Sequence, residues 1–138
     1  MPVNKRVLSA LSVAIAAFAA PASAQEIDCG DAMAQQDMNR CAGLDHKAAD
    51  AELNTVWKEA KAAARDLDAE QPDDLKGAEK ALLAAQRGWI AYRDGQCVLA
   101  GFEARGGSME SMLVSGCLAE LTRARTKELR EFFYGPAE

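Results

Sequence analysis

The stretch AQRGWIAYRDGQC, residues 85–97, carries four chemically distinct side chains at helical spacing. Intervals of three, four and four residues place on one helix face Gln86, Trp89, Arg93 and Cys97. An amide, an indole, a guanidinium and a thiol gathered in this way could form a reactive site, a binding surface or the polar interior of a small protein.

Reactive chemistry finds little support in the residue types. A catalytic cysteine needs a thiolate and a base partner, whereas the four cysteines of this chain are an even number that two disulfides would consume. The single histidine, His46, stands without a CxxC pair, so we expect a solvated helix residue and no metal site. A glycine-rich phosphate loop after a strand is also missing from the sequence. We therefore expect neither an enzyme nor a bound cofactor.

The first 24 residues have the pattern of a signal peptide. Lys5 and Arg6 precede an uncharged apolar run of about 14 residues, which is shorter than the roughly 20 that span a bilayer. Ala22-Ser23-Ala24 follows as a small-x-small cleavage site. We expect cleavage near Ala24 and a periplasmic or secreted protein, made of residues 25–138, without a membrane anchor.

The charge of the chain limits its partners. The formal net charge is −5, and loss of Lys5 and Arg6 makes the remainder more acidic. Nucleic acid and anionic membranes repel such a protein, whereas a basic protein attracts it.

Composition and periodicity predict three helices and no strand. Alanine, leucine, glutamate, lysine and arginine dominate, and no run alternates β-branched residues. We expect helices over about 36–67, 74–104 and 108–133. Short connections between long helices favour antiparallel neighbours, so the expected fold is an all-α, up-down-up three-helix bundle in a single domain.

Two turns join these helices. Pro72 interrupts the first connection, because proline lacks an N–H donor and disfavours helix in the residue before it. Gly106 and Gly107 form the second, where Ser108 is the expected N-cap of the third helix.

The cysteine pairing follows from the same geometry. Cys97 and Cys117 lie at similar distances from the second turn, so they sit level on facing helices and predict a disulfide. Cys29 and Cys41 then remain for the second bridge. Twelve residues of continuous helix would separate them by ~18 Å, beyond the ~4.4–6.8 Å that a disulfide allows. The segment around Cys29 must therefore leave the helix and fold back.

The polar face of residues 85–97 has a counterpart in ADAELNTVW, residues 49–57. Counting outward from the first turn places three pairs opposite each other: Asp50 and Arg93, Trp57 and Gln86, and Asn54 and Trp89. We expect an inter-helix polar network with Asp50 and Arg93 as its charged pair, which fixes the register of the helices. For the neighbouring Asp94, a structural role and a partner-binding role remain equal alternatives.

The motifs ADAELN and AQRGWIAYRDGQC, followed by a downstream cysteine and a charged helix, resemble the LprI-like lysozyme-inhibitor family, long catalogued as a bacterial domain of unknown function. The resemblance extends from Cys29 to about Leu129. It implies a small exported helical domain held by disulfides and, further, inhibition of lysozyme. Trp57 replaces the usual tyrosine of the family, and no lipid-attachment cysteine is present.

Five acids gather around the first turn without a base among them: Asp66, Asp68, Glu70, Asp73 and Asp74. They form either a solvated loop that favours the start of the second helix or a surface that steers a basic lysozyme. The candidate partner-binding residues are therefore Asp68, Glu70, Asp73, Asp74 and Asp94. The basic stretch RARTKELR, residues 123–130, is expected to be a solvated face.

Two functions agree with these patterns. The first is an exported protein that binds and blocks lysozyme and so protects peptidoglycan. The second is a periplasmic helical protein-interaction or stress-related binding module without activity on lysozyme.

Overall fold

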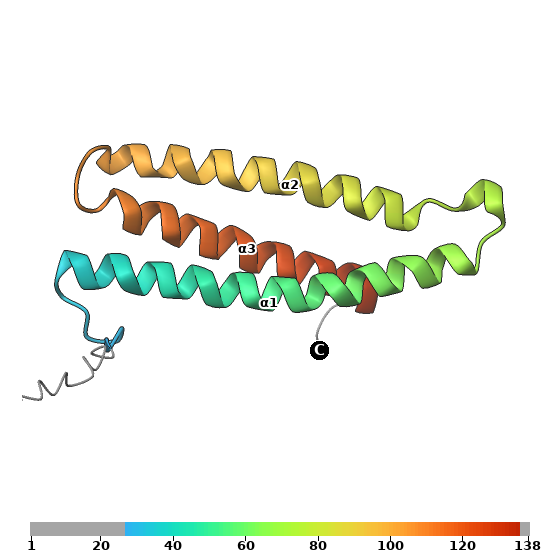
Figure 1. Cartoon of the computed structure of the whole chain (residues 1–138), viewed down its shortest axis with the longest axis horizontal. Helices are drawn as coiled ribbons and strands as arrows, with labels where there is room; N and C mark the ends of the chain where they lie inside the picture. The colour runs from blue at the N-terminus through green and yellow to red at the C-terminus, as the bar shows by residue number, and fades with distance from the viewer. Residues whose placement is uncertain (1–26, 136–138) are drawn as a thin grey trace, which may run out of the picture.

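The computed structural model describes residues 27–135 as an antiparallel, up-down-up bundle of three long helices (Figure 1). The helices are α1 (Gln35–Ala69), α2 (Ala78–Gly101) and α3 (Glu110–Tyr134). Short 3₁₀ turns, η1 (Asp73–Leu75) and η2 (Phe102–Ala104), flank α2, and residues 27–135 contain no strand. The predicted all-α bundle is confirmed, although α2 itself is shorter than expected because both of its ends change to 3₁₀ geometry. The expected signal peptide, residues 1–24, lies outside the described residues.

The bundle is organised around α3, which makes its most extensive contacts with α1 and also packs along α2. Contacts between α1 and α2 are fewer. The core contains leucines and valine on facing helices together with small alanines of α1, which allow close helix packing. Its buried members are Leu53, Val56, Ala60, Ala64, Leu82 and Leu129. Two helices that were expected to face each other directly are thus largely bridged by the third.

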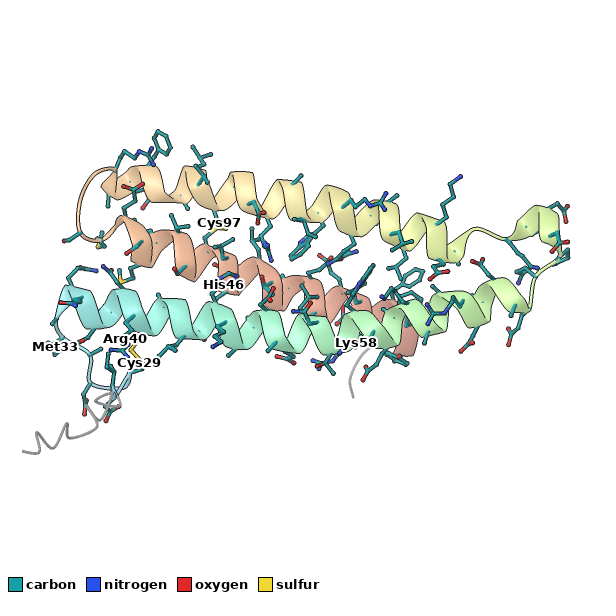
Figure 2. All side chains as sticks on the ribbon, in the orientation of Figure 1. Cys29, Met33, Arg40, His46, Lys58 and Cys97 are labelled. Atoms are coloured by element: carbon teal, nitrogen blue, oxygen red, sulfur yellow. A yellow bond between two sulfur atoms is a disulfide. The ribbon has the colours of Figure 1, made fainter. Side chains whose placement is uncertain are left out.

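Both predicted disulfides are confirmed. Cys29 and Cys41 have Cα atoms 5.6 Å apart, and those of Cys97 and Cys117 are 5.4 Å apart. Cys29 precedes α1, and its segment turns back beside the beginning of that helix (Figure 2). Each cross-link restricts the unfolded chain and should contribute about 2–4 kcal/mol to stability.

The turn before α3 differs from the sequence expectation, because Ser108 does not cap the helix. No side chain forms a cap hydrogen bond at this helix start. Instead, the Glu110 carboxylate accepts the Gly106 N–H at 2.7 Å and an Arg105 N–H at 2.6 Å. The Ser108 carbonyl accepts from the Asn39 amide at 2.8 Å, which ties the turn to α1. The backbone N–H of Gly106 lowers the pKa of Glu110.

Gly101 allows a close approach of α2 and α3 beside the Cys97–Cys117 bridge. A Cβ atom at Gly101 would lie 2.7 Å from Val114 Cγ2. Such a distance forces the neighbouring side chain or helix to move.

Replacing Gly101 with alanine should therefore destabilise the protein by about 1–3 kcal/mol, the usual cost of overpacking. The matched control is Gly43→Ala in α1, where a Cβ would meet nothing within 4 Å. That variant should gain about 0.5–1 kcal/mol, because alanine favours a helix interior. Urea unfolding measures both, and equal effects of the two substitutions would contradict the close approach.

Candidate functional site

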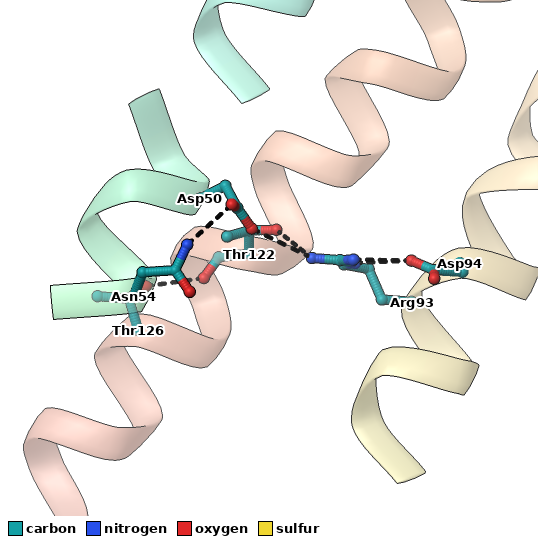
Figure 3. A network of polar contacts seen from close by, with 6 residues as sticks. All are labelled: Asp50, Asn54, Arg93, Asp94, Thr122 and Thr126. Atoms are coloured by element: carbon teal, nitrogen blue, oxygen red, sulfur yellow. Dashed lines mark hydrogen bonds and ion pairs between the residues drawn. The ribbon is translucent and has the colours of Figure 1, made fainter. Parts of the chain in front are cut away.

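Arg93 of α2 reaches both other helices (Figure 3). Its side chain is 14% exposed, and its Nη1 atom lies 3.3 Å from Thr122 Oγ1 on α3 and 3.9 Å from Asp50 Oδ1 on α1. Its Nε and Nη2 atoms each lie 2.9 Å from Asp94 Oδ1. A nearly buried cation is thus held by groups from all three helices.

Asp50 lies at the rim of this arrangement. Its side chain is 47% exposed, and its 3.9 Å separation from Arg93 is long for an ion pair. The second carboxylate oxygen accepts a hydrogen bond from the Asn54 amide at 2.9 Å. The structure therefore brings Asp50, Asn54 and Arg93 together, but Thr122 and Asp94 approach Arg93 more closely than Asp50 does.

Trp89 lies beside two arginines. The Arg93 Cζ atom is 4.9 Å from its ring centroid, and the Arg125 Cζ atom of α3 is 6.0 Å away. Arg125, which is 13% exposed, donates to the buried Gln86 Oε1 atom at 3.0 Å and pairs with Glu128 at 3.1 Å. Cation–π attraction to Trp89 and the hydrogen bond to the Gln86 side chain compensate the partial desolvation of the arginines.

Two of the three expected inter-helix pairs, Trp57 with Gln86 and Asn54 with Trp89, form no hydrogen bond within residues 27–135. Gln86 bonds to Arg125 instead of Trp57, whose side chain packs against the core cluster. Asn54 bonds within α1 to Asp50, while Trp89 faces arginines. Helix α3 packs against both α1 and α2, and its Arg125 supplies the partner of Gln86 and a second cation beside Trp89.

Two buried threonines of α3 belong to the polar cluster and were not among the residues predicted for it. Thr122 and Thr126 are buried, and the Thr126 hydroxyl donates to the Thr122 carbonyl at 2.9 Å. A usable signal existed, because Ala119, Thr122, Thr126 and Leu129 recur at intervals of three, four and three and all are buried. The expectation that residues 123–130 form a solvated face is consequently wrong for Arg125.

Asp68 caps the start of α2, although it lies near the end of α1. Its carboxylate accepts the N–H groups of Gly77 and Ala78 at 2.7 Å and that of Glu79 at 3.1 Å. These three hydrogen bonds hold the pKa of Asp68 below its ordinary value. Gly77 has a φ of 150°, a conformation that L residues with side chains rarely adopt. The Asp68 carboxylate therefore caps α2 within the fold, and its contact with a partner stays a prediction.

The other acids of the first turn point to solvent. Asp66, Glu70 and Asp74 are exposed, and Asp73 pairs at 2.6 Å with Lys76 while its side chain remains 96% exposed. Asp94 lies far along α2 from them and is engaged by Arg93. The five candidate partner-binding acids thus do not form one surface.

The arrangement around Arg93 joins helices and presents no activated nucleophile. Within residues 27–135 all four cysteines are in disulfides, and no group of three histidine, cysteine or acidic residues could hold a metal ion. His46 is half-buried, with its Nε2 atom buried and without a hydrogen-bond partner among the described residues, so the expectation of a solvated histidine is wrong. In Figure 2, His46 lies where α1 runs beside α3.

These features define a small helical bundle locked by two disulfides and a polar cluster. The family model described as "Lysozyme inhibitor LprI" matches residues 28–129, and the chain belongs to this family. The chain is also 61% identical over 117 residues to an uncharacterized protein of Rhizobium meliloti (strain 1021), an alignment that covers 81% of this chain and 84% of that protein. No solved structure matches.

The resemblance inferred from the sequence is thereby confirmed. The matched range contains both disulfides and the cluster around Arg93. Disulfides and family membership fit an exported protein. None of the described helices is long and apolar enough to cross a membrane.

A double-mutant cycle on Asp50→Asn and Arg93→Gln tests the charged pair. Because Asp50 is half exposed and distant, the coupling energy should be small, about 0.2–1 kcal/mol. The Arg93 substitution alone should cost more than the Asp50 substitution, since it also removes the contacts with Thr122 and Trp89. Thermal unfolding measures each variant, and strictly additive effects would exclude the pairing.

Asp68→Ala should lower the melting temperature at neutral pH, with Asp74→Ala as the exposed control. The pKa of Asp68 is lowered in the folded state, so its contribution is fully present above the unfolded pKa, near 3.8, and is lost as pH falls through the folded pKa. The difference between wild type and Asp68→Ala should therefore shrink only in strong acid. A difference that is constant through acid pH would show that the carboxylate charge is irrelevant to the cap.

Proposed function

We propose that this protein binds lysozyme and blocks its action on peptidoglycan. The observation that carries the proposal is the match of residues 28–129 to the lysozyme-inhibitor family. The polar cluster around Arg93 is largely occupied by its own contacts, so the partner-binding surface has to be sought elsewhere on the bundle.

The tip of the α1–α2 hairpin is a suitable surface by shape and charge. In Figure 1 this hairpin extends beyond the C-terminal end of α3, so its tip projects from the bundle. Four exposed acids occupy the tip: Asp66, Glu70, Asp73 and Asp74. Lys76 offsets only part of this charge through its pair with Asp73. A projecting acidic hairpin favours approach to a basic enzyme.

An apolar groove adjoins the same tip, where α3 ends. It has a volume of about 380 Å³ and receives Leu67 and Leu82 from the hairpin and Leu129, Phe132 and Phe133 from α3. Phe132 is 76% exposed. Exposed aromatic side chains beside charged rims are typical anchors of protein interfaces.

The acidic tip and the apolar groove would affect different steps of binding. The acids would accelerate the encounter with a basic lysozyme, because complementary charge acts at long range and chiefly raises the association rate. The groove and Phe132 would then hold the complex, since burial of apolar area slows dissociation. Blocking follows if the projecting hairpin occupies or covers the substrate cleft.

Purified disulfide-bonded protein should slow the clearing of a peptidoglycan suspension by at least one lysozyme among c-type and g-type enzymes. Charge reversal of Glu70, Asp73 and Asp74 to lysine should reduce the association rate about tenfold at low salt and flatten its salt dependence. Surface plasmon resonance at several salt concentrations measures the rate.

The control reverses three acids that are exposed elsewhere, Asp31, Glu59 and Glu120, and thus changes the net charge equally. It should slow association far less. If the protein at excess neither inhibits these lysozymes nor forms a complex with them on size exclusion, the inhibitor function is refuted for those classes. If both charge variants behave alike, the hairpin tip has no special role.

A further inference from the structure

From Ala81 onward the side of α2 that faces away from the bundle carries no charged residue, and Lys80 lies at its edge near the start of the helix. A helix at a protein surface normally places charged and polar residues on its solvent side. The buried side of α2 contains Leu82, Gln86 and Cys97. On the opposite side, an exposed stripe of uncharged residues runs from Ala81 to Phe102, the first residue of η2, and we call it the outer stripe. The Arg105 Cζ atom lies 4.6 Å from the Phe102 ring centroid at the end of this stripe.

The two halves of the outer stripe differ in size. Its first half contains only small residues, all exposed: Ala81, Ala84, Gly88 and Ala91. Its second half contains large residues, with one further glycine, and all are exposed: Tyr92, Gly95, Val98, Leu99 and Phe102. Small side chains therefore lie towards the acidic tip and large ones towards the second turn.

Two glycines in the outer stripe have no explanation within the bundle. Gly88 and Gly95 lie in the interior of α2, where glycine is less favourable than alanine. A Cβ atom at either position would meet nothing within 4 Å, so neither glycine serves packing inside the chain. Their common effect is to expose helix backbone, which allows another helix to approach closely.

We propose that the outer stripe docks against the outer stripe of a second copy of this chain, with the two α2 helices antiparallel. A two-fold axis beside residues 91 and 92 brings the small half of each stripe against the large half of the other. The facing pairs are Ala81 with Phe102, Ala84 with Leu99, Gly88 with Gly95, and Ala91 with Tyr92. A parallel arrangement would instead bring large against large and leave gaps between the small halves.

Charge at the flank of the stripe agrees with the antiparallel register. Arg87 and Asp94 both lie about a quarter turn to the same side of the stripe. A two-fold axis at residues 91 and 92 brings Arg87 of one copy within ~3 Å along the axis of Asp94 of the other. This pairing occurs twice in the dimer. Arg87 forms no ion pair within residues 27–135, whereas Asp94 also pairs with Arg93 of its own chain.

The exposed area is large enough for a modest dimer. Tyr92, Val98, Leu99 and Phe102 are 59%, 52%, 61% and 55% exposed, respectively. Together they offer on the order of 500 Å² of mostly apolar surface per copy, comparable to the largest patch of a typical monomer. Two copies would bury roughly 1,000 Å² or more, at the lower limit of stable interfaces, so the dimer should be concentration-dependent.

Sedimentation equilibrium of the disulfide-bonded protein at about 1–200 μM should show a monomer–dimer equilibrium with a dissociation constant in the micromolar range. Leu99→Glu should raise this constant at least tenfold, because it buries two charges in the stripe. The matched control is Leu44→Glu, which alters another exposed leucine, 50% exposed on α1, and should leave the constant unchanged. Circular dichroism melts verify that both variants fold.

Arg87→Glu provides an independent check at an exposed position that should not affect folding. It should raise the dissociation constant severalfold at low salt, with a smaller effect at high salt. A protein that stays monomeric throughout this range, or a dimer that tolerates Leu99→Glu, would overturn the proposal. Inhibition of lysozyme is measured separately, so either proposal can fail without the other.

Discussion

The contact of one nearly buried guanidinium with all three helices is the constraint on which the bundle depends. Arg93 comes from α2, yet its partners lie on α1 and α3 as well as on its own helix. Apolar packing alone would tolerate a shift of one helix by a turn against its neighbour. The planar Arg93 guanidinium has donors in fixed directions, so it can be satisfied in few arrangements of the helices. Trp89 and Arg125 extend the same constraint, because the Trp89 ring on α2 lies near the Arg125 guanidinium on α3 as well as near Arg93, which limits rotation of α2 against α3. Register is thus set near the middle of the bundle by polar groups, while leucine and alanine contacts supply most of the burial.

Helix periodicity and cysteine spacing predicted the fold well, because both depend on distance along the chain. Cys97 and Cys117 could be paired by counting residues from a turn, since rise per residue is nearly constant in a helix. The hydrogen-bond partner of Gln86 could not be predicted in this way, because it depends on how α3 is rotated and placed against the other two helices. Arg125 and Asp68 show the same limit. Each stands among charged neighbours that suggest a solvated surface, and only the tertiary contacts with Gly77 and Gln86 distinguish them from those neighbours.

In the motif of residues 85–97, some side chains face the interior and others face the outer stripe, while the acidic tip and the groove beside Phe132 lie outside the motif. Gln86, Trp89 and Arg93 lie in the interior or its margin, where they contact other parts of the same chain. The acidic tip and the groove beside Phe132 lie at one end, and the outer stripe covers the side of α2 away from its neighbours. Such separation lets the surfaces change charge and shape while the interior keeps the helices in place. It also explains why a motif with unusual side chains at helical spacing need not mark a reactive site.

The two disulfides make the two ends of the bundle unequal. Both lie towards the end that contains the start of α1 and the second turn, opposite the acidic tip (Figure 2). Local opening of a folded protein begins where the fewest constraints must be broken. We therefore expect the cross-linked end to stay closed when the hairpin beyond α3 opens locally, and backbone amides should exchange their hydrogens progressively faster towards Pro72. The tip of the α1–α2 hairpin can therefore change its conformation while the disulfide-linked end of the bundle stays folded.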